Sequence, residues 1–231
     1  MCGLAGTVNL SGVLDLDINK KRFAKAYQYL KARGPDDSGV WHDKNTFFLH
    51  TRLKIIDLKK TSAQPMEIGN YIICYNGEIY NFQKIKNLLL KKGYQFKSSG
   101  DTEVLLKAWI EWREEAIEKL DGMFAFSIWD KKEKTLFLAR DRFGKKPLIY
   151  SSKNNTFSFA SDIMSLKQLQ DGGDVSKEAI KSLFRFRCIY EPLTIFENFR
   201  KLPPGSFLIY NRYGVKVSKY YDLSKKSQGA L

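Results

Sequence analysis

The sequence predicts an α+β fold in which antiparallel sheets are covered by helices. Its middle third is a run of short strands separated by polar turns, at 123–129, 135–140, 148–151 and 156–160. Segments with helical periodicity lie before and after this run, so strand hairpins and helices are grouped apart along the chain. Chains of that organisation form packed sheets with helices on their outer faces.

The flanking segments supply the remaining elements. A strand over 3–10 precedes a helix over 18–33, which the Gly34-Pro35 pair ends. A hairpin over 206–221 turns at 212–214. We also expect strands at 40–41, 46–52 and 71–75, and helices at 82–92, at 176–186 and from Asp101 or Thr102 to Trp112.

The composition favours a globular protein of a reducing compartment. The chain has 231 residues, of which 43% are hydrophobic, enough for a substantial core. It contains neither an apolar run of about 18 residues nor a charged-then-apolar leader. Its three cysteines are widely spaced and form no disulfide framework. We therefore expect a cytoplasmic protein without membrane contact.

The net charge of +14 raises the question of nucleic-acid binding. The basic residues are mostly lysines scattered over helix faces and turns, as at 20–22 and 131–132. Zinc-ligand pairs, RNA-binding aromatic motifs and Arg-rich tails do not accompany them. We interpret them as solvated basic faces and expect no nucleic-acid partner, with a basic module for RNA or acidic surfaces as the alternative.

Cys2 follows the initiator Met and is the strongest candidate nucleophile. Met is removed when the next residue is small, so we expect the mature chain to begin at Cys2. One residue then carries a thiol, of ordinary pKa about 8.5, and a free α-amine of about 7.7–8.0. Because a thiol is mostly protonated at neutral pH, an attached base activates it. Taken alone, a Cys at this position is also compatible with no function.

Six further local sequences follow the CGLAG of residues 2–6 in a fixed order. They are RGPDDSG at 33–39, HTRLKIID at 50–57, YNGEIYN at 75–81, SGDTE at 99–103, LDGMFAF at 120–126 and ARDRFG at 139–144. In order and spacing, these motifs resemble the N-terminal glutaminase domain of glutamine-hydrolysing asparagine synthetases, a class II glutamine amidotransferase. The resemblance runs from Cys2 to about Asp222.

The resemblance implies a four-layer αββα sandwich of two antiparallel sheets, the N-terminal-nucleophile hydrolase fold. It also implies hydrolysis of the glutamine side-chain amide to glutamate and ammonia through a thioester on the N-terminal cysteine. The glutaminase domain would span 2–222, and 223–231 would be a tail or the start of a linker to a synthetase domain absent from this chain.

The family's catalytic groups carry over to Cys2, Asn76 and Gly77. In the family, a side-chain amide and a backbone N–H stabilise the oxyanion that forms when the thiol attacks, and these correspond to Asn76 and Gly77. Gly allows close approach of the backbone to the substrate. Read alone, however, an Asn-Gly pair is also typical of a type I′ turn.

The family's glutamine-binding groups carry over to the segments around Arg52 and Asp101. A planar guanidinium suits the α-carboxylate of glutamine, and a carboxylate suits its α-ammonium. Arg52 is alternatively a solvated charge at a strand end, and Asp101 alternatively a helix N-cap, or both at once. The remaining binding residues implied by the resemblance are Leu53, Lys54, Ile55, Ile56, Asn76, Gly77 and Glu78.

We expect the histidines and the other two cysteines to have structural rather than catalytic roles. A Cys–His dyad with His42 or His50 is unnecessary when the α-amine serves as base, so we expect His50 to be structural. We expect Cys74 and Cys188 to be buried as small hydrophobic residues. We interpret residues 140–142 as a charge cluster or a domain contact, and Met123 as core or as part of an ammonia route.

The sequence does not contain the ATP-binding loop of asparagine synthetases. The Gly172-Gly173 pair lacks the serines of the family's Ser-Gly-Gly-x-Asp-Ser loop, so we expect no cofactor and no metal in this chain, and ATP with Mg²⁺ only for the missing synthetase domain. The expected partners are glutamine, that domain or subunit, and a second copy of the chain in a homodimer. Alternatives are an amidotransferase half for another carboxylate, such as a sugar acid, and an N-terminal-Cys amidase acting on a different amide.

Overall fold

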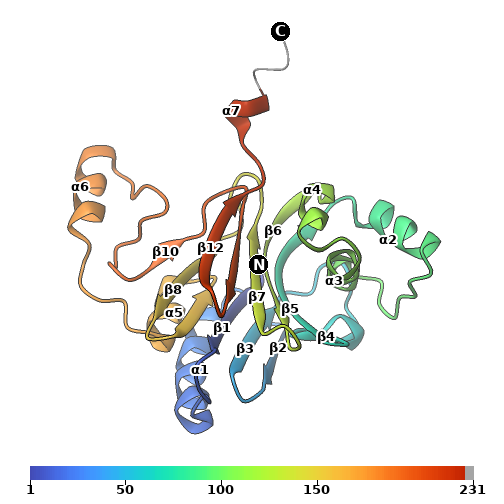
Figure 1. Ribbon diagram of the computed structural model, residues 1–231, viewed down its shortest axis with the longest axis horizontal. Helices are drawn as coiled ribbons and strands as arrows, with labels where there is room; N and C mark the ends of the chain where they lie inside the picture. The colour runs from blue at the N-terminus through green and yellow to red at the C-terminus, as the bar shows by residue number, and fades with distance from the viewer. Residues whose placement is uncertain (227–231) are drawn as a thin grey trace.

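Two six-stranded sheets form the frame of the computed structural model, which describes residues 1–226 (Figure 1). All neighbouring strands in both sheets are antiparallel. Sheet A has the order β10-β8-β9-β1-β3-β2, with bounds Arg200–Lys201, Ile149–Lys153, Thr156–Ala160, Gly3–Asn9, Thr46–Arg52 and Asp37–His42. Sheet B has the order β12-β11-β7-β6-β5-β4, with bounds Gly214–Lys219, Ser206–Asn211, Thr135–Arg140, Gly122–Asp130, Tyr71–Ile79 and Met66–Ile68.

Seven α-helices accompany the sheets within residues 1–226. They are α1 Leu16–Leu30, α2 Phe82–Lys91, α3 Asp101–Trp112, α4 Ala116–Lys119, α5 Ile163–Leu169, α6 Lys177–Phe186 and α7 Leu223–Lys226. Short 3-10 turns cover Lys60–Ser62 and Arg113–Glu115. Of the expected tail, residues 223–226 form α7, and 227–231 lie outside the described residues.

Three hydrophobic cores define four layers. The central core joins the inner faces of the sheets, with Phe48 and Phe159 from sheet A against Trp129 and Leu138 from sheet B. A second core packs sheet B against α2, α3 and α4, and a third packs sheet A against α1 and α5. Figure 1 shows these helix groups on opposite sides of the strands. The expected α+β, four-layer αββα arrangement is confirmed.

Helix α1 shows how the local sequence produces this packing. The Asp15 side chain accepts a hydrogen bond from the Ile18 N–H at 3.0 Å and so caps the N-terminus. Phe23, Ala26 and Leu30, spaced three and four residues apart, are buried against sheet A. The helix ends at Leu30, three residues earlier than the Gly34-Pro35 pair indicated, because residues 31–33 form a turn.

Several expectations about local structure were wrong. Strand β5 continues through Asn76 and Gly77 to Ile79, so this pair is not a turn. Strands β4 and β10 and helix α5 were not expected from the sequence, because the two strands have only three and two residues and the helix has only seven. Cys74 is buried as expected, but Cys188 is exposed because it follows α6, whose buried residues are few.

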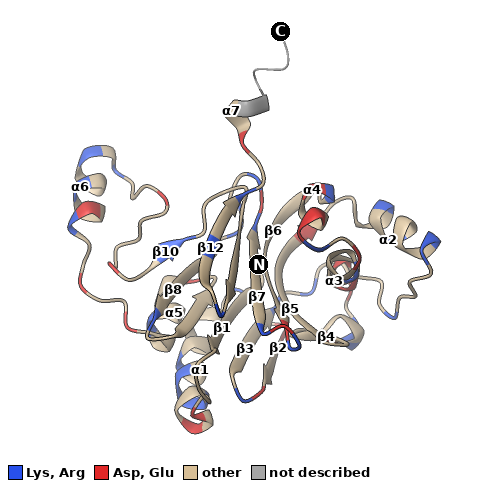
Figure 2. Cartoon of the chain, in the orientation of Figure 1, with Lys and Arg blue, Asp and Glu red and all other residues tan. Residues whose placement is uncertain are grey.

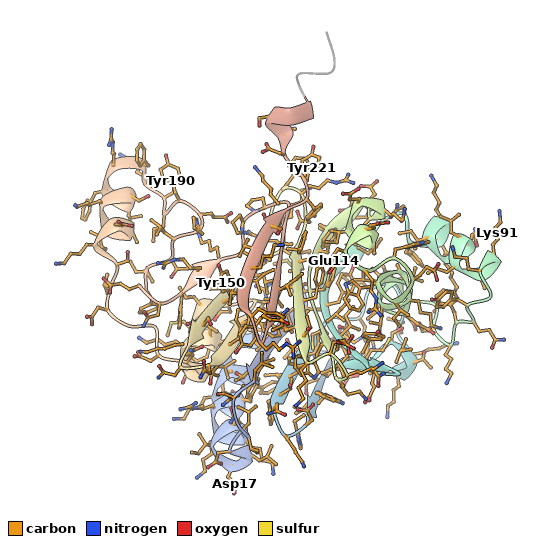
Figure 3. The ribbon with its side chains drawn as sticks, in the orientation of Figure 1. Asp17, Lys91, Glu114, Tyr150, Tyr190 and Tyr221 are labelled. Atoms are coloured by element: carbon orange, nitrogen blue, oxygen red, sulfur yellow. The ribbon has the colours of Figure 1, made fainter. Side chains whose placement is uncertain are left out.

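Helix α6 stands away from the sheets. Figure 3 shows it with Tyr190 at the edge of the molecule, whereas Tyr150 lies over the strands. Phe184 on this helix is 84% exposed. Among the residues that Figure 2 colours, the basic ones are spread over α1, α2, α6 and the turns, interspersed with acidic ones. Within residues 1–226, none of the helices is sufficiently long and apolar to span a bilayer.

Arg140 and Asp141 lock the connection between the sheets. Arg140 is 6% exposed and donates to the carbonyls of Gly144, Lys146 and Leu202 and to the Glu191 carboxylate. The Asp141 carboxylate accepts four backbone N–H groups, from residues 124, 143, 145 and 146. Because backbone groups, together with the Glu191 carboxylate for Arg140, satisfy both charges, these two residues fit the expected structural cluster.

A buried histidine links the two sheets directly. His50 on β3 is fully buried, and its Nε2–H donates to the Tyr75 carbonyl on β5 at 3.0 Å. Its Nδ1 has no hydrogen-bond partner in residues 1–226. Burial lowers the pKa of His50 from 6.5 to about 4, so the ring is neutral at physiological pH. This is the structural role expected for His50.

The central core should dominate stability. Phe159 is fully buried and its ring lies 5.6 Å from that of Phe48. The F159A substitution should lower the free energy of unfolding by about 3–5 kcal/mol, because it removes apolar area and leaves a cavity. The matched F184A substitution, at an exposed ring, should change it by less than about 0.5 kcal/mol. Chemical denaturation measures both, and equal effects would contradict this assignment of the core.

The neutral state of His50 makes the fold sensitive to acid. In the unfolded chain the ring takes up a proton near pH 6.5, whereas in the folded chain it does so only near pH 4. Stability is therefore complete above pH 6.5 and falls towards pH 4, by about 3 kcal/mol from this residue. In H50Q, which keeps an amide donor for Tyr75, denaturation at pH 7 and pH 4 should show a smaller loss than the wild type. An equal loss would refute this role of His50.

Candidate active site

One pocket collects nearly all the residues singled out from the sequence. It encloses about 190 Å³ where the N-terminus meets the ends of β3 and β5 and the start of α3. Figure 1 shows the N-terminus against the strands of sheet B. The lining comprises Met1, Cys2, Arg52, Leu53, Ile55, Ile56, Asp57, Ser62, Gln64, Tyr75, Asn76, Gly77, Glu78, Gly100, Asp101, Thr102, Met123 and Lys146.

Strand pairing places Cys2 at this pocket. Gly3 is paired with Thr51, so the residue before β1 lies beside the residues that follow β3. The Leu53 N–H donates to Cys2 Sγ at 3.4 Å, and the thiol lies 3.7 Å from the Leu53 carbonyl. Arg33 fixes the backbone by donating from Nε to the Cys2 carbonyl at 3.2 Å.

The thiol of Cys2 is protonated in this setting. Burial raises its pKa, although the Leu53 N–H, the N-terminal amine and Arg52 oppose that rise. A thiol of raised pKa needs a base next to it before it can attack a carbonyl carbon. His50 is not such a base, because its protonated nitrogen is bound to the Tyr75 carbonyl and burial keeps the ring neutral.

Arg52 ends β3 and is only 6% exposed. Its Nη1 donates to the Lys59 carbonyl at 3.0 Å and its Nη2 donates to the Asp57 carbonyl. No carboxylate in residues 1–226 forms an ion pair with it. The interpretation of Arg52 as a solvated strand-end charge is therefore wrong, and an unpaired positive charge lines the pocket.

The Asp57 carboxylate stabilises the loop after β3, whose carbonyls accept the hydrogen bonds of Arg52. The carboxylate accepts hydrogen bonds from the Ser62 hydroxyl at 2.7 Å, the Lys59 N–H at 2.8 Å and the Ser99 N–H at 3.1 Å. These bonds outweigh burial and hold the pKa of Asp57 well below its usual range. The loop after β3 is thereby tied to the segment before α3, and both segments line the pocket.

Asn76 presents an unsatisfied donor. The residue is 1% exposed, and its side-chain nitrogen Nδ2 has no hydrogen-bond partner in residues 1–226. Leaving a buried amide unpaired costs about 1–3 kcal/mol, so most buried polar groups in proteins have a partner. Because Asn76 lines the pocket, a ligand oxygen is the natural acceptor for this group.

The Gly77 N–H faces the edge of β5 away from β6, as the strand register shows. Phe124, the partner of Gly77 on β6, exchanges its N–H and carbonyl with Asp141 instead of with β5. Gly77 is therefore a non-hydrogen-bonded position of the β5–β6 ladder, and its N–H faces the opposite edge of β5. A Cβ at Gly77 would meet the Met123 carbonyl oxygen at 2.2 Å, so the close strand pairing requires glycine here.

Asp101 lies at the start of α3 and is 6% exposed. Its Oδ2 accepts the Tyr75 hydroxyl at 2.7 Å and the Ile79 N–H at 3.0 Å. Burial raises its pKa, which those two donors and its own N–H partly offset. Gly100 is the N-cap residue and makes no side-chain cap, so the interpretation of Asp101 as N-cap is wrong.

Lys54 is the one expected binding residue that does not line the pocket. Its N–H donates to the Asp36 carboxylate at 2.8 Å. The sequence analysis in turn missed Tyr75, Gln64 and Lys146, which all line the pocket. Lys146 is 6% exposed, and its Nζ has no partner in residues 1–226. The position of Tyr75 next to the Asn-Gly pair could have identified it as a site residue. The sequences around Gln64 and Lys146 contain no motif that would have identified these two residues.

The described residues contain no cluster for a metal ion. Within residues 1–226, no group of three or more His, Cys, Asp or Glu side chains could hold one. The pocket instead combines the Cys2 thiol, the cations of Arg52 and Lys146, the carboxylates of Asp57, Glu78 and Asp101, and the free N–H donors of Asn76 and Gly77. That set suits an acyl transfer from a small ligand with charged ends.

Comparisons with known proteins agree with this geometry. The family described as "Glutamine amidotransferase domain" matches residues 1–221. Asparagine synthetase [glutamine-hydrolyzing] 3 of Bacillus subtilis is 34% identical over 232 residues, which cover 98% of this chain and 37% of the relative. Asparagine synthetase [glutamine-hydrolyzing] 1 of the same organism is 39% identical over 208 residues, which cover 89% of this chain and 33% of the relative. The chain thus spans about a third of the length of these relatives.

Solved structures support the fold. The glutamine phosphoribosylpyrophosphate amidotransferase from B. subtilis superposes with a TM-score of 0.67 at 18% identity, covering 95% of this chain and 49% of that chain. A glutamine aminotransferase class-II domain protein from Silicibacter pomeroyi gives a TM-score of 0.54 at 14% identity, covering 95% and 98%. With the family match over residues 1–221, these findings show that the chain belongs to the glutamine amidotransferase domain family.

Proposed function

We propose that this pocket hydrolyses the side-chain amide of glutamine to glutamate and ammonia, with Cys2 as nucleophile. The observation that carries the proposal is the buried, unpartnered Nδ2 of Asn76 in the same pocket as the Cys2 thiol. A donor of that kind is costly in the empty site and becomes satisfied when an oxyanion forms beside it. The Gly77 N–H, which faces the free edge of β5, is the second donor.

The reaction follows from the protonated state of the thiol. Because burial raises its pKa, Cys2 attacks the amide carbon as its proton passes to the α-amine of the processed chain. The amine then protonates the leaving nitrogen, which departs as ammonia and leaves a thioester. Water attacks the thioester carbon, the C–S bond breaks, and glutamate and the thiol are released. Met1 lines the same pocket, so its removal frees the amine and also clears space.

The charged ends of glutamine match two of the charged groups that line the pocket. The unpaired Arg52 guanidinium is the partner for the α-carboxylate, and Asp101 is the partner for the α-ammonium. Leu53, Ile55, Ile56 and Glu78 complete the walls. Binding the amino-acid end leaves only the amide within reach of Cys2. An amidase for an uncharged amide has no need of this Arg52–Asp101 pair.

The ammonia is destined for an amide-forming partner. The relatives are named asparagine synthetases and are about three times the length of the matched region, which supports aspartate as the acceptor in an ATP-dependent C-terminal domain. ATP and Mg²⁺ belong to that domain, and another carboxylate, such as a sugar acid, is the alternative acceptor. The three free cysteines of the described chain fit a reducing cytoplasm.

Replacing Cys2 tests the proposal most directly. C2A should abolish glutamate release, because no other group can form the thioester. The matched C188A substitution removes an exposed thiol outside the pocket and should leave turnover unchanged. A glutamine-like diazoketone should label the wild type at Cys2 alone, as read by peptide mass spectrometry. Turnover by C2A, or a label on another residue, would refute the proposal.

Asn76 should act in the chemical step. Loss of one oxyanion donor typically lowers kcat by about 10²–10³-fold, so N76A should show that loss with a KM close to the wild-type value. Steady-state kinetics with glutamine measure both constants. Glutamine affinity measured by calorimetry in C2A and in C2A/N76A is the control and should be similar. A variant that changes only KM would show that Asn76 binds the substrate without stabilising the oxyanion.

A further inference from the structure

Tyr75 connects the two ends of the candidate site. Side chains alternate along β5, so Tyr75 packs in the core between sheet B and the helices, whereas its neighbour Asn76 lies on the opposite face of the strand. The phenol is 2% exposed, and its hydroxyl donates to Asp101 Oδ2 at 2.7 Å. The residue that precedes the oxyanion pair therefore also contacts the carboxylate proposed for the α-ammonium.

Both polar backbone groups of Tyr75 are hydrogen-bonded to side chains. Its N–H donates to Gln64 Oε1 at 2.6 Å, and its carbonyl accepts the His50 Nε2–H at 3.0 Å. Gln64 in turn donates from Nε2 to the Thr102 hydroxyl at 3.4 Å, next to Asp101 on α3. Tyr75 thus joins β3, β5 and α3, and a shift of its backbone would displace Asn76 directly.

The charge state of Asp101 depends on the hydroxyl of Tyr75. Burial raises the pKa of Asp101, and the bonds from Ile79 and Tyr75 lower it. A carboxylate that loses one donor becomes easier to protonate, and a protonated Asp101 cannot pair with an ammonium. The titratable groups that line the pocket with Asp101 are Tyr75 and Glu78 from β5, the Met1 amine and Cys2 before β1, Arg52 at the end of β3, Asp57 in the loop after it and Lys146 after β7.

We propose that Tyr75 is a positioning residue that orients Asp101 for the α-ammonium of glutamine. It acts through its hydroxyl and does not touch the reacting amide. The inference rests on the proposed function, because it assigns the α-ammonium to Asp101. It predicts that the contribution of the hydroxyl disappears when the ligand has no ammonium group.

The test compares two substrates in the Y75F variant. Glutaramate retains the amide and the carboxylate of glutamine but lacks the α-amine. For glutamine, Y75F should raise KM about tenfold, the size expected when a hydrogen bond to a charged group is lost, with kcat within about twofold. For glutaramate, kcat/KM should be the same in Y75F and wild type. The acid limb of the kcat/KM profile for glutamine should also move to higher pH, because Asp101 then protonates more easily.

A matched control uses the same strand and the same substitution. Tyr71 lies at the other end of β5, where its hydroxyl accepts a hydrogen bond from Arg113 Nη2 at 2.6 Å, outside the pocket. Y71F should leave KM, kcat and the pH profile for glutamine unchanged. Denaturation of Y75F and Y71F shows that both variants are folded.

The outcomes separate this inference from the proposed function. Equal losses with glutamine and glutaramate, or an unchanged pH profile, would overturn the positioning role while glutamine hydrolysis stands. A wild-type protein without glutaminase activity would overturn the proposed function. In that case, the affinity of glutamine for C2A and C2A/Y75F still decides whether Tyr75 acts through the ammonium, and equal affinities would count against it.

Discussion

The open edge of β5 is the constraint on which the site depends. Strand β4 pairs only with residues 71–73, so the rest of that edge has no neighbouring strand. The Tyr75 and Ile79 N–H groups are satisfied there by the Gln64 and Asp101 side chains. Gly77 lies between them, and its N–H is left for a ligand. A longer β4 would pair this edge and remove the donor, so the shortness of β4 is part of the site.

Neutral hydrogen-bonding groups hold the charged side chains of Arg52 and Asp101 in the pocket. Their charges therefore remain available to bind a charged ligand. Arg52 is bound by two carbonyls, and Asp101 by a hydroxyl and an N–H. Ion pairs within the protein would fix these side chains equally well but would cancel the charges that recognise an amino acid. By contrast, Arg140 donates four hydrogen bonds, one of them to the Glu191 carboxylate, and Asp141 accepts four backbone N–H groups, so both residues serve the frame. The number of hydrogen bonds made within the described residues thus distinguishes these binding charges from the structural ones.

The sequence was a good guide where the signal is local. The strands of the central hairpins have strong alternation and polar turns, and their observed bounds differ little from the expected ones. Short elements such as β4 and β10 carry too few residues for periodicity to register. The Asn76-Gly77 pair illustrates the limit of local rules, because the pairing of β5 with β6 overrides the turn preference of the dipeptide. Cys188 was misjudged because burial depends on where α6 packs.

The sequence by itself determined the α+β class, the family resemblance and the order of the motifs, because strand alternation, glycine turns and motif spacing are local properties. Of the site residues expected from those motifs, all but Lys54 line the pocket, although the motifs also contain the pocket residues Asp57, Tyr75, Gly100 and Thr102, which were not expected. Only the tertiary structure decided that Tyr75, Gln64 and Lys146 join them, that Asn76 has a free donor and that Arg52 is unpaired. These facts depend on hydrogen bonds between residues distant in the chain, which no local pattern records.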